Sequence, residues 1–589
     1  MWTITMIEFL QIPAVILLSG ALIVAVLPSR IRSFAFLIFP AAALASLWSF
    51  PDEHVIRLSF ATYELVPLKI DALSRVFGTI FSLVGVVGGI YALHIQDRTQ
   101  QINALLYSAG ALGVTLAGDF FTLFVFWEMM AVSSAYLIWA RRTEDSDRAG
   151  MRYLMMHFLG GGLLFSGILL QLGSTGSILI QSFEYEFSIT SVLILLGVSL
   201  NAAVPPLHAW LSDAYPRATI TGAVFMSALT TKSAMYVLIR LYPGWEVLVW
   251  VGIVMALYGA VYALMADDIR EILAFSIISQ LGYMVTAVGI GTEMAINGAA
   301  THAFSHILYK SLLFMAAGAV IYATGRSRLS ELGGLASRMK WVLVLYMVGG
   351  ASISGLPLFN GFISKSMIIS AAGEAHYEWA MLLLMVASIG SFLHTGLKLP
   401  YFTWIAPARG QEILDSTGKP RPPVEVRPLP SNMMVAMFIG AALCIFFGVY
   451  PFALYEQLPY ASDYNPFTLY HFVETAQLLV IALGIFWALK SWLAEKQSIT
   501  LDVDWFYRKP LLWLANHFLF VIGGIYGWFA DAVADLAAAL SRGFVNPMKW
   551  LNPFGSSENE SANYSPAMGT AMGFILFVFV ILGLFMLLQ

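Results

Sequence analysis

The chain has 589 residues, of which 59% are hydrophobic and 11% charged, and its mean hydropathy is +0.77. A soluble domain carries about 25% charged residues, so this composition excludes a soluble globular protein and indicates a polytopic membrane protein. The net charge of -4 comes without a basic stripe, which excludes nucleic-acid binding, and the single cysteine, Cys444, excludes an internal disulfide or an iron–sulfur cluster held by this chain alone.

Apolar segments long enough to cross about 30 Å of hydrocarbon recur along the chain. We expect about sixteen crossings if the segments that contain Pro205-Pro206 and Pro357 each count as one broken crossing. In chain order the predicted spans are 12–27, 33–49, 72–95, 101–117, 120–140, 153–173, 190–214, 218–240, 246–266, 271–292, 297–322, 341–372, 380–404, 433–455, 474–493 and 568–588.

The charges in the loops predict the orientation of the chain. Lys and Arg gather in alternate loops, such as the one with Arg141, Arg142 and Arg148, and only loop 50–71 and Arg240 break this pattern. The opposite loops without any Lys or Arg are 174–189, 293–296, 373–379 and 456–473. Because loops rich in Lys and Arg stay on the cytoplasmic side, we expect a multi-pass protein of the cell (inner) membrane with both termini outside the cytoplasm.

The segment 498–550 does not read as an ordinary span. Its apolar run is interrupted by Asp531, Asp535 and Arg542. A long amphipathic helix along the membrane interface fits this pattern, and a membrane hairpin is the alternative. A polar linker, 551–566, then leads to the last predicted span.

Two stretches of the chain resemble each other and indicate an internal repeat. HFLGGGLLF (157–165) matches HILYKSLLF (306–314) at the His and the Leu-Leu-Phe, and the spacing from Pro205 to Asp213 equals that from Pro357 to Lys365. The copies begin an odd number of spans apart, so they must be inverted in the membrane. Inverted repeats with broken helices are typical of transporters, which hold their ions near the midplane.

The expected fold is therefore an all-α polytopic membrane protein with two inverted five-helix repeats, each with a broken helix, and a C-terminal interfacial helix. Proline removes a helical hydrogen-bond donor, and such breaks are tolerated in lipid only where protein or a hydrated cavity satisfies the backbone. The break positions are Asn201, Pro205, Pro206, Gly355 and Pro357. The predicted regions are N-terminal helices (1–100), the first repeat (101–240), the second repeat (246–404), additional helices (405–493), the lateral helix (498–550) and the final span (568–588).

Few ionisable residues lie well inside the apolar spans, where a charge is costly and is functional by default. These residues are Glu128, Lys232, His302, His306, Lys310, Lys365, His394 and Lys398. Structural roles remain open for some of them, because Lys365 and Lys398 could snorkel toward an interface. Glu128 and Lys232 are too central for that, and their structural alternative is an ion pair.

His302, His306 and Lys310 stand four residues apart and share one helix face. Zinc binding lacks a third ligand, and Lys310 would repel the cation. Haem ligation requires a facing histidine on another helix. A proton relay fits best, because histidine titrates near neutral pH and both accepts and donates protons; a neutral packing histidine is the alternative for one of the two.

Five motifs carry a resemblance to a known family. They are FWEMMAVSSAYLI (126–138), PPLHAWLSDAY (205–215), DIREILAFSIISQLGYM (268–284), THAFSHILYKSLLF (301–314) and SGLPLFNGFISK (354–365). Over about residues 70–405 the chain resembles the antiporter-like membrane subunits of respiratory complex I, the large subunits of Mrp-type cation/proton antiporters, and subunits of related membrane-bound hydrogenases. The longer members of this group also have an interfacial helix followed by a last span.

The resemblance implies roles for residues already selected by their position. Glu128 matches the glutamate at the entry of the first half-channel, and Lys232 matches a lysine of the eighth helix. His302, His306 and Lys310 match the central relay, and Lys365 matches the terminal residue of the second half-channel. One position departs: where the family usually has a lysine paired with the glutamate, this chain has Asn201. Our hypothesis is that Lys232 takes over that role, with His208 as an alternative, or that the first half-channel does not pump.

We therefore expect a proton-translocating subunit of a multisubunit membrane complex, either an Mrp-type antiporter, which also exchanges Na⁺, or a complex I-like or hydrogenase complex. Its expected partners are other membrane subunits, protons, lipid and, in an antiporter, sodium ions, with no metal, no cofactor and no covalent chemistry in this chain. The alternatives are a scaffold subunit without transport activity, or a membrane enzyme such as a quinone reductase. No HExxH, GxSxG or cysteine cluster supports the enzyme.

Overall fold

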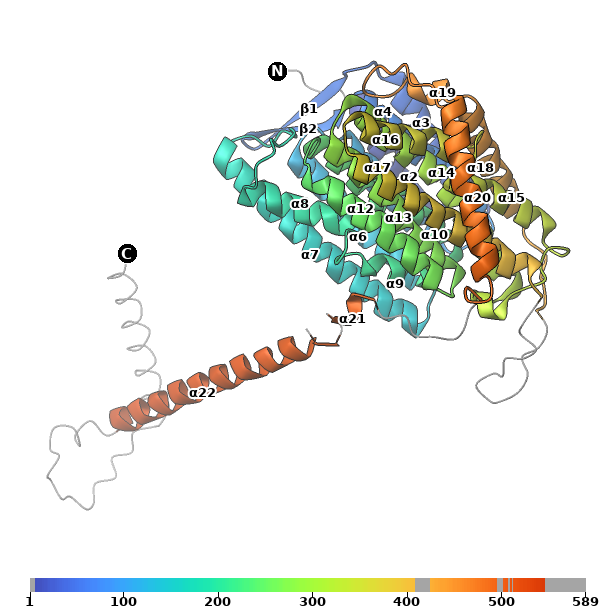
Figure 1. The fold of residues 1–589 in the computed structure, drawn as a ribbon. Helices are drawn as coiled ribbons and strands as arrows, with labels where there is room; N and C mark the ends of the chain where they lie inside the picture. Colours follow the sequence, from blue (N-terminus) through green and yellow to red (C-terminus); the bar gives the residue numbers. More distant parts are fainter. Residues whose placement is uncertain (1–5, 408–423, 495–501, 507–508, 511, 546–589) are drawn as a thin grey trace, which may run out of the picture. The chain divides into compact units, whose positions relative to one another are not determined.

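The computed structural model describes residues 6–407, 424–494, 502–506, 509–510 and 512–545. The chain divides into two compact units, Met1–Thr500 and Leu501–Gln589. In the first unit, long helices run side by side as a bundle (Figure 1). The described part is almost entirely helical, as the composition predicts for a polytopic membrane protein.

The first half of the bundle runs from the N-terminus to the eighth predicted span. Its helices are α1 (Met6–Gln11), α2 (Pro13–Val26), α3 (Ser29–Ser49), α4 (Ala72–Tyr91), α5 (Arg98–Leu116), α6 (Phe120–Trp139), α7 (Glu144–Thr175), α8 (Ile189–Asn201), α9 (Ala209–Arg217), α10 (Ile220–Ala228) and α11 (Thr230–Leu241).

The second half continues with α12 (Val247–Met265), α13 (Ile269–Ile290), α14 (Glu293–Thr324), the short η1 (Leu329–Glu331), α15 (Lys340–Ser354), α16 (Asn360–Glu374), α17 (Glu378–Ser391), the π-helical segments η2 (Phe392–Lys398) and η3 (Tyr401–Ile405), α18 (Ser431–Val449), α19 (Phe452–Tyr455) and α20 (Leu469–Leu489). The second unit contains α21 (Asp504–Phe506) and α22 (Leu512–Val545).

Twelve helices of the described residues are long and apolar enough to cross a membrane. Three shorter apolar helices, α2, α8 and α15, add to them, and α8 and α15 each end at a predicted break. The expected count of about sixteen crossings and the inverted relation of the two repeats stay predictions. The last predicted span, 568–588, lies outside the described residues.

A β-hairpin corrects the expectation of an all-α chain. The strands β1 (Val55–Phe60) and β2 (Tyr63–Lys69) pair antiparallel in the segment that we expected to be a loop. The hairpin is fastened to the bundle because Val66 N donates to Asp119 Oδ2 over 2.7 Å. Asp119 also caps α6 by accepting a hydrogen bond from Thr122 N. The β-rich composition of VIRLSF and YELVPLK was the available signal.

Both predicted helix breaks lie where the prolines place them. Residues 202–208 separate α8 from α9, and Ala203 has a positive φ of 55°. Residues 355–359 separate α15 from α16, and Gly355 has a φ of 77°, which glycine adopts without strain. Gly361 lets α16 start directly against α15, because a Cβ there would lie 1.7 Å from the Ser352 carbonyl oxygen.

The eighth span was expected to be continuous, but it is interrupted at Leu229, between α10 and α11. No proline marks this break. Side chains replace the missing helical hydrogen bonds: Tyr215 Oη donates to Met226 O over 2.7 Å, and Thr230 N donates to Tyr107 Oη over 3.0 Å. The break is therefore stabilised by tertiary contacts and could not be read from local sequence.

The helix α22 settles the choice between the two interpretations of segment 498–550 as far as it is described. It is one continuous helix of 34 residues, about 50 Å long, so the hairpin alternative is wrong for Leu512–Val545. Its position along the membrane interface stays a prediction.

An ion pair ties α4 to α11. The Arg240 guanidinium bonds the Asp71 carboxylate, which also caps α4 through Ser74 N at 2.9 Å, and the two side chains are only 23% and 14% exposed. Burial acts to raise the pKa of the Asp71 carboxyl, but the charge and hydrogen bonds of Arg240 and the Ser74 N–H outweigh it and hold this pKa below its usual range.

Replacing Asp71 with Asn should destabilise the protein by about 2 kcal/mol, because the Arg240 charge stays half-buried without its partner. Since the folded pKa of Asp71 is lowered, its stabilisation is present above its ordinary pKa of 3.8 and is lost as the pH falls through the lower folded value. Thermal unfolding of the detergent-solubilised protein at several pH values measures this. The exposed pair Arg57–Glu64 is the control: Glu64→Gln should leave the unfolding temperature unchanged, and an equal loss in both variants would contradict the prediction.

Candidate functional site

The helix α14 runs through the centre of the bundle and carries three of the predicted site residues. His302, His306 and Lys310 are all fully buried. His302 Nδ1 lies 2.9 Å from Ser364 Oγ of α16, and Lys310 Nζ donates to Ser276 Oγ of α13. The ring centroids of His302 and His306 are 6.3 Å apart. Both ring nitrogens of His306 and Nε2 of His302 are without a hydrogen-bond partner among the described residues.

Lys365 lies on α16, just beyond the break that follows α15. Its Nζ donates to the Ile353 carbonyl over 2.7 Å and approaches Ser388 Oγ of α17 at 3.5 Å. The ammonium group also lies 5.0 Å from the ring centroid of Tyr283, a cation–π distance. Lys365 is 3% exposed, so the snorkelling alternative is wrong for it. The helix break supplies the carbonyl that holds the buried charge.

Lys232 lies at a helix break in the same way. It is fully buried at the start of α11, and its Nζ donates to the Ser227 carbonyl over 2.7 Å and to Thr231 Oγ1 over 3.1 Å. Because the helix is interrupted at Leu229, the Ser227 carbonyl is available to the ammonium group. Lys232 forms no ion pair with Glu128 in the described structure, so the ion-pair alternative is wrong for both.

The charged residues on three helices act on one another at the centre of the bundle. The electrostatic fields of Lys232, Lys310 and Lys365 all reach His306, so the lysine of the eighth span and the lysine of the twelfth span flank the histidine face of α14. In a medium of low dielectric, charges at such distances interact by several kcal/mol. The structure thus brings Lys232, His302, His306, Lys310 and Lys365 into one buried group.

His394 and Lys398 lie on the π-helical segment η2 of the thirteenth span. His394 Nδ1 lies 2.7 Å from Thr395 Oγ1, and both residues are fully buried. Lys398 Nζ donates to the carbonyls of Leu264 and Ala266 over 2.5 Å and 3.0 Å, at the C-terminal end of α12. A cation at a helix C-terminus is stabilised by the helix dipole. Lys398 therefore caps α12 and does not snorkel.

Glu128 and Asn201 lie apart from this group. Glu128 of α6 is half-buried against Gly161 of α7, where an added Cβ would lie 1.8 Å from its Oε1. Asn201 is the last residue of α8 and is 1% exposed. Glu128 Oε1 and Asn201 Oδ1 both lack a hydrogen-bond partner among the described residues. His208, the alternative partner of Glu128, is buried at the start of α9 beside Tyr258.

The structure adds polar residues that sequence reasoning did not select. Ser276 and Gln280 stand four residues apart on α13; Ser276 accepts the Lys310 hydrogen bond, and Gln280 Nε2 donates to Ser391 Oγ over 2.9 Å. Their spacing within an apolar span was the signal that could have found them. His471 and Glu474 near the start of α20 were overlooked because the predicted span began only at residue 474.

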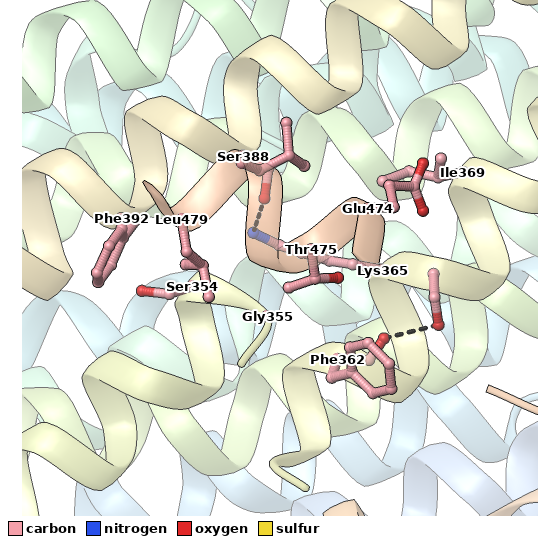
Figure 2. Close-up of a pocket in the computed structure, with 12 residues that line it drawn as sticks. Ser354, Gly355, Phe362, Lys365, Ile369, Ser388, Phe392, Glu474, Thr475 and Leu479 are labelled. Atoms are coloured by element: carbon pink, nitrogen blue, oxygen red, sulfur yellow. Dashed lines mark hydrogen bonds between the residues drawn. The ribbon is translucent and has the colours of Figure 1, made fainter. Parts of the chain in front are cut away.

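A small cavity of about 20 Å³ lies beside Lys365 and has room for one water molecule. Lys365 and Ser388 line it together with Glu474 and Thr475 of α20 (Figure 2). No three His, Cys, Asp or Glu side chains converge on a metal site within the described residues. The arrangement can therefore hold and pass protons, because it combines titratable side chains, hydroxyl groups and space for water.

Comparisons with known proteins agree with this architecture. Residues 117–393 match the family described as "NADH:quinone oxidoreductase/Mrp antiporter, TM". The chain is 28% identical over 476 residues to the uncharacterized protein MJ1309 of Methanocaldococcus jannaschii, covering 75% of this chain and 95% of that protein. It is 30% identical over 433 residues to the large Na(+)/H(+) antiporter subunit of Alkalihalophilus pseudofirmus, covering 65% of this chain and 52% of that relative.

Among solved structures, a chain of the Mrp complex from Dietzia sp. DQ12-45-1b has a TM-score of 0.67 and 25% identity, with 81% of this chain and 98% of that chain covered. The chain spans about half the length of the Alkalihalophilus antiporter protein. Through residues 117–393, the chain therefore belongs to the family of antiporter-like membrane subunits that Mrp-type antiporters share with respiratory NADH:quinone oxidoreductase.

Proposed function

We propose that this chain is a proton-translocating subunit of a multisubunit membrane complex, and that protons move through the buried group around α14 to Lys365. One observation carries the proposal: two buried lysines, each held by the carbonyl of an interrupted helix, flank two histidines with unpartnered ring nitrogens. A purely structural group would have these polar atoms satisfied, because an unpaired buried polar atom costs free energy.

The proposed mechanism is electrostatic. Lys232, Lys310 and Lys365 cannot all carry a charge cheaply, because like charges in a low-dielectric interior repel by several kcal/mol. A proton that enters or leaves at one site changes the proton affinity of its neighbours. The neutral histidines between them pass a proton by accepting it on one ring nitrogen and releasing it from the other. A charge rearrangement can thus travel along the membrane plane to Lys365.

The name of the Alkalihalophilus relative suggests sodium as the exchanged ion, and we propose Na⁺/H⁺ exchange as a second activity of the assembled complex. Other membrane subunits are the proposed partners, with this chain in the cell membrane and its termini outside the cytoplasm. His394 and Lys398 extend the proposed pathway along η2, where π-helical turns often mark functional sites.

Replacing Lys365 with Ala in the complex, reconstituted in proteoliposomes, should abolish proton flux, because the proposed terminal site loses its titratable group. Flux is measured with a pH-sensitive dye and compared between H₂O and D₂O. The control is Lys340→Ala, since Lys340 is exposed at the start of α15 and its removal should leave flux unchanged. Unchanged flux in Lys365→Ala would support the scaffold alternative instead.

The first half of the chain is tested by the substitutions Lys232→Ala, Glu128→Gln and Asn201→Lys. If Lys232 has replaced the lysine that the family usually carries at position 201, Lys232→Ala should lower flux about tenfold or more, because a positioned proton-transfer group contributes at least that much. Asn201→Lys should restore part of the flux lost in Lys232→Ala. Wild-type flux in Lys232→Ala would contradict this hypothesis and confine transport to the half with Lys365.

A further inference from the structure

The helix α20 carries a polar pair on an otherwise lipid-like surface. Most of its apolar side chains are exposed, including Val480, Ile481 and Leu483, yet His471 and Glu474 near its start are 10% and 11% exposed. A carboxylate held inside an apolar span is costly unless it has a partner or a task. Their burial is set by what α20 packs against, which is α17 and the segment η2 beside Lys365.

Glu474 lies on the cavity that Lys365 lines. The cavity of about 20 Å³ is bounded by Lys365 on one helix and by Glu474 and Thr475 on another (Figure 2). One water molecule fits there and would have the Ser388 hydroxyl, the ammonium group and the carboxylate as partners. A proton that leaves Lys365 therefore meets Glu474 through a single water.

From Glu474 a chain of polar contacts leads away from Lys365. Glu474 Oε2 lies 3.6 Å from His471 Nδ1, and His471 Nε2 lies 3.2 Å from the Tyr464 hydroxyl. His471 Nδ1 is buried and has no hydrogen-bond partner in the described structure. The Tyr464 hydroxyl in turn lies 3.4 Å from Ser370 Oγ.

Tyr464 is also part of the wall of an open hollow. This hollow has a volume of about 610 Å³, and three carboxylates line it, those of Glu293, Glu374 and Asp463. It is formed by loops that contain no Lys or Arg and are therefore predicted to lie outside the cytoplasm. Burial raises the pKa of Tyr464, so the phenol keeps its proton at neutral pH and acts as a hydrogen-bonded carrier.

We propose that Glu474, His471 and Tyr464 form the outward proton exit of the Lys365 half-channel and connect the Lys365 cavity with the acidic hollow. This inference rests on the proposed function, proton transfer through Lys365, and adds the residues that complete its path to the external side.

Each step conserves protons. The Lys365 ammonium releases a proton to the cavity water, which passes one of its own to the Glu474 carboxylate. The resulting carboxylic acid rotates to protonate His471 Nδ1, and the imidazolium releases its Nε2 proton to the Tyr464 oxygen while that hydroxyl gives its proton to water in the hollow. Exchange of the remaining Nδ1 proton to Nε2, through the neutral tautomers, restores the starting state.

The decisive substitution is Glu474→Gln, which keeps the size and hydrogen bonding of the side chain but cannot take up a proton. Proton flux of the reconstituted complex should fall about tenfold or more, and Glu474→Asp should recover part of it. The second His–Glu pair on the same predicted side, His376 and Glu378, is 3.8 Å apart but 88% and 66% exposed. Glu378→Gln is therefore the matched control and should transport like the wild type.

The outcomes separate this inference from the proposed function. If Lys365→Ala loses flux while Glu474→Gln keeps it, the exit through α20 is wrong and the transport function stands. If neither substitution lowers flux, the proposed function itself fails.

Cysteine accessibility provides a readout that does not depend on flux. The only natural cysteine, Cys444, is buried, so Glu474→Cys introduces a single accessible thiol. A membrane-impermeant thiosulfonate should modify it from the external side and not from the cytoplasmic side. Modification only from the cytoplasmic side, or none from either, would overturn the exit.

Discussion

The buried ammonium group held by a main-chain carbonyl is the interaction on which the rest of the site depends. Lys365 bonds the Ile353 carbonyl, and Lys232 bonds the Ser227 carbonyl. In both cases the helix is interrupted next to the acceptor, so the carbonyl lacks its usual intrahelical donor. The broken helix needs a donor and the buried lysine needs an acceptor, and each therefore stabilises the other.

This way of holding a charge suits a site that must release protons. A carboxylate partner would bind the ammonium form through a full opposite charge, whereas a carbonyl contributes only a hydrogen bond and a partial charge. No carboxylate pairs with Lys232, Lys310 or Lys365 in the described structure, and their partners are carbonyl and hydroxyl oxygens. Each lysine can thus exist with or without its extra proton, and the fields of its neighbours decide between the two states.

The two halves of the chain differ in how they treat this design. Around Lys365 the elements α13, α14, α16 and α17 converge, and serines and Tyr283 surround the charge. In the first half, Asn201 ends α8 without a charge, and Glu128 keeps an oxygen without a described partner. Lys232 turns to the carbonyl at its own helix break, close enough to α14 to act on His306. The chemistry of the first half is consequently drawn toward the centre of the bundle.

The sequence by itself determined the membrane class, most of the spans, the breaks at Pro205-Pro206 and Pro357, and the family, because hydropathy, proline and motif order are local signals. It also selected the ionisable residues, since a charge inside an apolar run is visible without a structure. Tertiary structure alone decided the interruption at Leu229, which Tyr107 and Tyr215 stabilise from other helices. It alone placed Glu474 beside Lys365, more than a hundred residues away, because such a contact depends on how α20 packs and leaves no local pattern in the sequence.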